Sequence, residues 1–326
     1  MALTKPSFLT NIITSLATTS ADRGLTESAF KAKFDETVTA IKAYLNDVLT
    51  AEVDTALGLK LNITDGIGRN KIINGNFGIN QRVVSGTVIK TVGLYGHDRW
   101  KAGAAGCTYT FSTTANVTTI TISAGSLIQV IEGLNLQSGT HTLSWTGTAQ
   151  GKIGAGSFSA TGVTGSATGG TNLSIEFGTG TLSKVQFEKG SIATTFEDRL
   201  FNLELSLCQM YYEKSYDLST APASNTQNGA VHIGAHIAIA GSVAGSIFTS
   251  IPFLTTKRIT PTNIKIYSSD GTIDAVYNVG TGSRTGVTAT NNGENRIGYL
   301  AVSNASATNI ALNAGLILHW TAESEL

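Results

Sequence analysis

The spacing of short apolar segments after residue 71 limits the possible fold more than any other feature of this sequence. The clearest segments are Ile72–Phe77, Thr108–Phe111, Val117–Ile122, Leu127–Ile131 and Leu173–Phe177. They recur at intervals of roughly eight to twelve residues without helical patterns between them, which is typical of an antiparallel β-sandwich. The composition agrees, because only 13% of the residues are charged and Thr, Ser, Asn and Gly occupy the polar positions.

A second β-rich region is predicted from residue 217 to 326. Alternation between apolar and polar residues returns at 231–239, and further apolar runs begin at Ile264 and Ile297. The pairs Asp270-Gly271 and Asn292-Gly293 are typical of hairpin turns. The chain is therefore predicted to be mainly β, with an all-β domain at its C-terminal end.

One helix is predicted near the N-terminus, from about Glu27 to Val53. Its apolar stripe consists of Phe30, Phe34, Val38, Ile41 and Leu45, at spacings of four and three residues. Either this stripe packs against the next domain of the same chain, or it self-associates into a short coiled coil. The bulky phenylalanines favour a three-stranded coiled coil or an attachment surface, so we expect these five residues to mediate trimerisation or attachment.

The segment Val185–Ser215 joins the two β regions. It begins as an alternating strand, turns at Gly190, and leads into an amphipathic helix predicted at Leu203–Tyr212. This order divides the chain into an N-terminal arm and helix (1–60), a sandwich (61–200), a junction helix (201–216) and the C-terminal β domain (217–326).

Several roles are predicted within this junction. Phe196 and Arg199 are expected to anchor it, with Glu188 or Glu197 as the salt-bridge partner of Arg199. The paired tyrosines that end the predicted helix, Tyr211 and Tyr212, are expected to lock the two β domains together.

The amino-acid sequence of this junction resembles that of tail-fibre and receptor-binding proteins of tailed bacteriophages. The resemblance rests on Q-F-E-K-G-S-I-A-T-T-F-E-D-R at 186–199 and C-Q-M-Y-Y at 208–212, where Phe187 and Met210 depart from the leucine and arginine of the family pattern. The strings I-N-G-N-F-G-I-N-Q-R at 73–82, D-R-W at 98–100 and H-W-T-A-E-S-E-L at 319–326 are also similar to that family.

The resemblance implies a trimeric virion component with a carbohydrate-binding-module-like sandwich. Its partners would be two further copies of itself, tail or baseplate proteins at the N-terminus, and a host surface glycan at the C-terminus. It would be made in the host cytoplasm and act at the host cell exterior. A purely structural baseplate, collar or head-fibre protein and a virion-associated glycan hydrolase remain the alternatives.

Contact with a receptor is expected near the C-terminal end, in the polar loop 280–294 and the aromatic residues beside it. The candidate residues are Tyr277, Arg284, Asn291, Asn292, Glu294 and Tyr299. The three tryptophans Trp100, Trp145 and Trp320 are instead expected in the core or at a subunit interface.

No catalytic motif is found, so we expect no enzymatic activity. Gly-x-Ser-x-Gly, a phosphate loop and His-Glu-x-x-His are missing from the sequence, and the glycines of 151–170 are interpreted as turns between short strands. His232 and His236 would lie about 13 Å apart on a strand, too far to share a metal. We expect neither metal nor cofactor.

The formal net charge of zero argues against a nucleic-acid partner. No apolar run is long enough for membrane insertion, and no secretory signal is expected at the N-terminus. Cys107 and Cys208 are expected to be buried free thiols.

Overall fold

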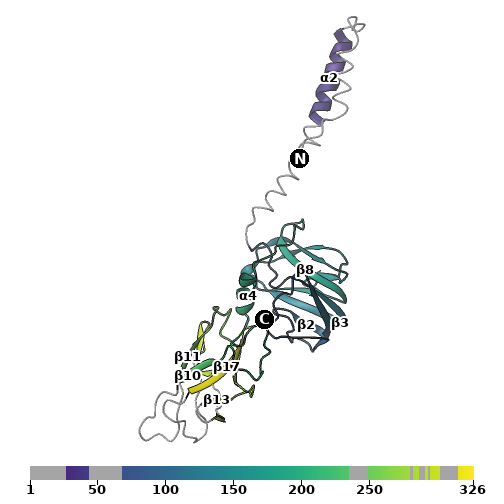
Figure 1. The fold of residues 1–326 in the computed structure, drawn as a ribbon. Coiled ribbons are helices and arrows are strands. Elements are labelled where there is room, and N and C mark those ends of the chain that lie inside the picture. The colour runs from purple at the N-terminus through teal and green to yellow at the C-terminus, as the bar shows by residue number, and fades with distance from the viewer. Residues whose placement is uncertain are drawn as a thin grey trace. The chain divides into compact units, whose positions relative to one another are not determined.

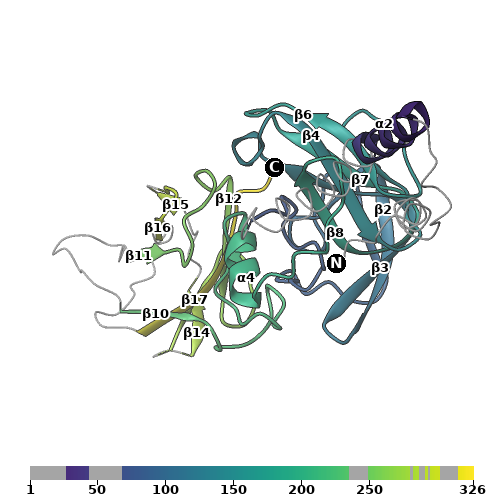
Figure 2. The ribbon, with the colours of Figure 1, turned by 90° about the horizontal axis from the view of Figure 1, so that it is seen from above.

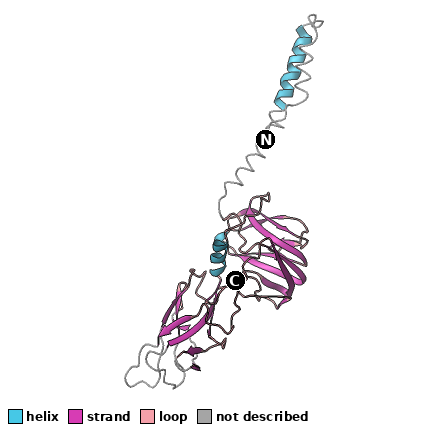
Figure 3. Ribbon diagram, in the orientation of Figure 1, coloured by secondary structure: helices cyan, strands magenta, loops and turns pink. Residues whose placement is uncertain are grey.

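The computed structural model describes residues 27–43, 68–234, 249–279, 282–285, 291–292, 294–301 and 315–326. The chain divides into two units, Met1–Gly66 and Ile67–Leu326. Antiparallel strands make up most of the described second unit (Figure 3), which confirms the mainly β class.

Helix α2 (Glu27–Ala43) is the described element of the first unit (Figure 1). Four residues of the predicted stripe, Phe30, Phe34, Val38 and Ile41, belong to it, whereas Leu45 lies outside the described residues. Val38 is half-buried and Ile41 is exposed. The coiled coil stays a prediction.

The first β region is a two-layer sandwich of eight strands. Its elements are β1 (Val88–Lys90), β2 (Lys101–Thr114), β3 (Val117–Ile131), the short 3₁₀ helix η3 (Gly133–Asn135), β4 (Gly139–Thr146), β5 (Gly151–Ile153), β6 (Val163–Ala167), β7 (Leu173–Phe177) and β8 (Gly180–Lys189). One layer has the order β1-β2-β3-β7-β5 and the other β8-β4-β6. The layers join where β3 pairs with β8, at Ile120 and Leu182.

The sandwich core is filled by side chains from both layers. Trp100, Leu143, Phe177 and Phe187 are completely buried, and burial of one such side chain contributes roughly 1.5–3 kcal/mol. Trp100 packs against Phe77 with ring centroids 4.9 Å apart, so its predicted core position is confirmed.

Three of the predicted strands differ from the structure. Ile72–Phe77 is a loop, because the Asn74 side chain bonds to the backbone of Ile79 and Asp98 instead of leaving the segment free to pair. The runs 117–122 and 127–131 belong to one strand, β3, which continues past Gly125 through a bulge opposite β2. Gly125 has φ +72, and a Cβ there would lie 2.0 Å from the Gly106 carbonyl oxygen, so the close approach requires glycine.

The C-terminal β region contains two sheets (Figures 1 and 2). The six-stranded sheet comprises β9 (Tyr212–Lys214), β10 (Val231–Gly234), β12 (Asn263–Ser268), β13 (Val276–Asn278), β14 (Ser283–Thr285) and β17 (Gly315–Glu323). The three-stranded sheet has the order β11 (Thr249–Pro252), β16 (Gly298–Ala301), β15 (Asn291–Asn292). Strand β17 pairs with β9, β10, β12 and β13, and its buried Leu316, Leu318 and Trp320 belong to the second hydrophobic core.

Helix α4 (Phe201–Gln209) stands between the two β regions in both views (Figures 1 and 2). It ends three residues before the predicted end at Tyr212. Tyr212 instead begins β9, because it pairs with Glu323 of β17. This partner is distant in the sequence, so helical periodicity could not indicate where the helix stops.

Candidate functional site

The six predicted receptor-contact residues fall on separate parts of the C-terminal region. Tyr277 on β13 and Arg284 on β14 are cross-strand partners in one hairpin. Tyr277 is half-buried. The two residues lie directly opposite each other in the β13–β14 hairpin.

The other candidates lie on or beside the three-stranded sheet. Asn291 and Asn292 form β15 and pair with Ala301 and Leu300, whereas Tyr299 pairs with Ile251. Glu294 is half-buried in the connection between β15 and β16. No hydrogen-bonded pairing among the described strands joins this sheet to the β13–β14 hairpin, so the six residues are divided between two sheets, and their common site stays a prediction.

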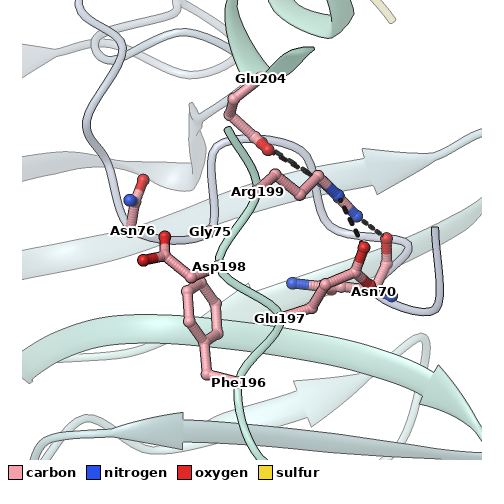
Figure 4. A pocket seen from close by; sticks show the side chains of 8 residues that line it. All are labelled: Asn70, Gly75, Asn76, Phe196, Glu197, Asp198, Arg199 and Glu204. Atoms are coloured by element: carbon pink, nitrogen blue, oxygen red, sulfur yellow. Dashed lines mark hydrogen bonds and ion pairs between the residues drawn. The ribbon is translucent and has the colours of Figure 1, made fainter. Parts of the chain in front are cut away.

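Arg199 holds the junction against the start of the sandwich (Figure 4). Its guanidinium donates to the carbonyl oxygens of Asn70 and Ile72 and pairs with Glu204 Oε2 of α4 at 3.1 Å. It also lies 3.4 Å from Glu197 Oε1. The anchoring role predicted for Arg199 is confirmed, while Phe196 is half-buried beside it.

The two junction glutamates have different partners. Glu197 accepts hydrogen bonds from the backbone N–H groups of Gly68 and Asn70, at 2.8 and 2.6 Å. Burial alone would raise the pKa of Glu197, but these bonds and the Arg199 charge outweigh it and lower that pKa. Glu188 does not pair with Arg199; it pairs with Arg69 at 3.1 Å.

The recess lined by these junction residues is too small for an organic ligand. Its volume is about 10 Å³, roughly the space for one water molecule. Several polar side chains of the motif at 186–199 have a structural role, because they bond to the protein itself: Gln186, Glu188, Thr194, Glu197 and Arg199.

The motifs at 73–82, 98–100 and 319–326 meet at a second polar cluster, between the sandwich and the C-terminal region. Arg99 Nη1 lies 2.6 Å from Glu325 Oε2, and Arg82 Nη2 lies 3.2 Å from Glu325 Oε1. Gln81 binds the Asp98 carboxylate and the Tyr212 carbonyl oxygen. The sequence indicated each motif separately but not their convergence.

The paired tyrosines lie in the same cluster. The Arg99 guanidinium lies 3.5 Å from the ring centroid of Tyr211, and that of Arg82 lies 3.9 Å from the ring centroid of Tyr212. Tyr211 also donates to Glu132 Oε2 at 3.0 Å. Burial raises the pKa of both tyrosines. Their predicted role in locking the β regions is confirmed.

A glycan hydrolase would need a pair of carboxylates, and four carboxylates of this chain have structural partners: Glu176, Glu188, Glu197 and Asp270. Glu176 pairs with Lys152 at 2.9 Å and accepts from the Ser126 hydroxyl, and Asp270 accepts from Thr272 within a turn. Glu188 and Glu197 belong to the junction. These contacts neutralise or orient each carboxylate without placing it in a substrate cleft.

Within the described ranges, no group of three or more His, Cys, Asp or Glu side chains is close enough to hold a metal ion. His232 is exposed, and His236 lies outside these ranges. Neither α2 nor α4 has the length and apolar character needed to cross a membrane.

The two cysteines, Cys107 and Cys208, are buried free thiols, as expected from the sequence. Burial raises the pKa of the Cys107 thiol to about 11, so this side chain stays protonated at neutral pH.

No family model matches the chain, and searches of curated proteins and of solved structures return no match.

Proposed function

We propose that this protein is a trimeric tail-fibre or receptor-binding component of a bacteriophage virion. In this role the N-terminal helix attaches the trimer to the tail or baseplate. The C-terminal β region contacts a host surface glycan, and three copies multiply weak single-site contacts through avidity.

The observation that carries the proposal is the arrangement around the Val185–Ser215 junction. The family-like motifs on both sides of it form a bonded connection through Arg199 and Arg99. Such a connection suits a fibre that must transmit force between a shaft and a tip. The neutral, Thr-rich surface also suits an extracellular particle.

Oligomeric state is the first test of the proposal. Light scattering on the full chain at micromolar concentration should give a mass near three times 33.9 kDa, and Ile41→Asp on the exposed side of α2 should shift it toward one chain. A monomer mass for the unmodified protein would contradict the proposed trimer.

Cell attachment separates a receptor binder from a structural spacer. Fluorescently labelled protein should sediment with some members of a panel of intact bacteria that differ in surface polysaccharide. Arg284→Ala should weaken this binding, whereas Lys184→Ala on the exposed side of β8 should not. If no strain retains the label, the structural alternative is favoured.

A further inference from the structure

A groove on the sandwich lies between the loop 154–159 and strand β6. Its volume is about 580 Å³, within the roughly 300–1,000 Å³ of small-molecule sites. The loop is closed by two backbone hydrogen bonds between Gly151 and Ser159, each 2.9 Å, and by one from Gly154 N–H to the Ser174 carbonyl oxygen at 2.8 Å. The groove wall is therefore held by bonded backbone.

An exposed aromatic ring forms part of this wall. Phe158 is 42% exposed, and Lys152 Nζ lies 4.7 Å from its ring centroid. Lys152 is itself held by Glu176 at 2.9 Å. A Cβ at Gly178 would lie 3.9 Å from Phe158 Cε1, so the ring rests close to that glycine. These contacts position the ring before any ligand arrives, which lowers the entropy cost of binding.

Hydroxyl groups line the groove beside the apolar side chains of Ile153, Val163 and Leu173. Ser157, Thr164 and Ser166 are exposed there, and their side chains make no hydrogen bond to other described residues. None of the lining residues is ionisable. Hydroxyls and one aromatic face suit a ligand that is neutral, rich in hydroxyl groups and apolar on one side.

A sugar ring has this combination, because its C–H groups form an apolar face and its hydroxyls form a polar edge. Lys152, the cation beside Phe158, is already paired with Glu176, so a charged ligand would lose hydration without gaining an available partner of opposite charge. An aliphatic ligand would instead cover the three hydroxyls without bonding to them.

We infer that this groove binds one neutral hexose unit of a glycan, stacked on Phe158 and hydrogen-bonded to the serine and threonine hydroxyls. The inference goes beyond the proposed function, which assigns host contact to the C-terminal region. A sandwich site would give each chain a second, separate sugar contact.

Saturation-transfer difference NMR on the full chain tests the site, because this method detects millimolar binding. The probes are maltotriose, cellotriose and lactose, with sialyllactose as an anionic comparison. We expect saturation of ring C–H protons in at least one neutral sugar. Phe158→Ala should weaken binding of that sugar about tenfold, the loss expected when roughly 1.4 kcal/mol of ring contact is removed.

Phe201→Ala is the matched control, because Phe201 is also an exposed phenylalanine but lies on α4 outside the groove. Phe158→Tyr should retain binding, since it keeps the stacking ring. Binding of none of the neutral sugars, binding of sialyllactose alone, or full binding by Phe158→Ala would each overturn the inference.

The outcome is independent of the cell-attachment test. If the protein sediments with bacteria but binds no free sugar, the sandwich site is overturned and the proposed function stands. If it binds a neutral sugar through Phe158 but attaches to no cell, the receptor-binding role is overturned and the sandwich site stands.

Discussion

At the residue scale, His97 shows how burial changes an ionisable group inside the D-R-W region. It is 1% exposed, with its ring 4.6 Å from that of Phe111 and its Nδ1 3.0 Å from the Tyr109 hydroxyl. Desolvation lowers the pKa of His97 from 6.5 to about 4. The folded protein therefore holds this imidazole neutral at pH values where an unfolded chain would protonate it.

This pKa shift predicts a loss of stability in mild acid. The contribution of His97 is fully present above pH 6.5 and falls as pH decreases toward 4, because the unfolded state then binds the extra proton. A pKa difference of one between the folded and unfolded states corresponds to roughly 1.36 kcal/mol. The full change in the pKa of His97 therefore lowers the free energy of unfolding by about 3 kcal/mol at low pH. Denaturant unfolding at several pH values should show a shallower decline for His97→Gln than for the unmodified protein.

His232→Gln serves as the control for that series, because His232 is exposed. It should retain the pH profile of the unmodified protein. Parallel profiles for His97→Gln and the unmodified protein would show that His97 does not cause the acid sensitivity.

At the element scale, helix α4 is bonded to different β regions at its two ends. Near its start, Glu204 accepts from the Asn74 backbone N–H and pairs with Arg199. At its end, the Gln209 carbonyl oxygen accepts from Lys257 Nζ at 2.6 Å, and that lysine also pairs with buried Glu213. The helix therefore connects the sandwich to the C-terminal sheet through buried charges as well as apolar packing.

Arg199→Ala should lower the free energy of unfolding by about 3 kcal/mol, because it leaves two partly buried carboxylates without their cation. Arg199→Lys should lose less, since it keeps the charge but not the forked geometry that reaches several acceptors. Denaturant unfolding measures both. Lys189→Ala, at an exposed side chain on β8, should change stability by no more than about 0.5 kcal/mol; an equal effect of the two alanine variants would exclude the anchoring role.

At the scale of the whole second unit, the last described residues fasten the two β regions together. Glu325 pairs with Arg82 and Arg99, and Arg258 binds Glu132 at 2.9 Å and the Ser324 carbonyl oxygen at 2.9 Å. Arg82 and Arg99 are largely removed from solvent. Burial is the largest influence and opposes the charge of each, but Glu325 and the neighbouring acidic and tyrosine side chains together outweigh it and raise the pKa of both guanidiniums.

Glu325→Ala should uncouple the unfolding of the two β regions. Calorimetry should show one unfolding transition for the unmodified protein and two for the variant. The free energy of unfolding should fall by about 3 kcal/mol, because two buried cations lose their shared carboxylate. Glu323→Ala is the matched control, since that side chain is 38% exposed and 3.8 Å from Arg82. Glu323→Ala should lower the free energy of unfolding by at most about 1 kcal/mol. Equal losses of stability in the two variants would contradict the fastening role of Glu325.

Local patterns predicted several elements because their causes lie within a few residues. The strand at Leu173–Phe177 has the predicted bounds, and Trp100 has its predicted core position. The prediction failed at Ile72–Phe77, where the Asn74 side chain satisfies the backbone. It also missed the sandwich groove, because glycine-rich residues 151–170 indicated turns but not the surface on which Phe158 would lie.

The sequence by itself determined the mainly β class and the order of the regions, since alternation and helical spacing are local properties of the chain. Only the tertiary structure decided what the motifs at 73–82, 98–100, 186–199 and 319–326 do: Arg99 and Glu325 are 226 residues apart, and Arg199 and Asn70 are 129 apart. Such pairings depend on how the sheets fold back on one another. The same folding decided that Tyr212 pairs as a strand rather than ending a helix.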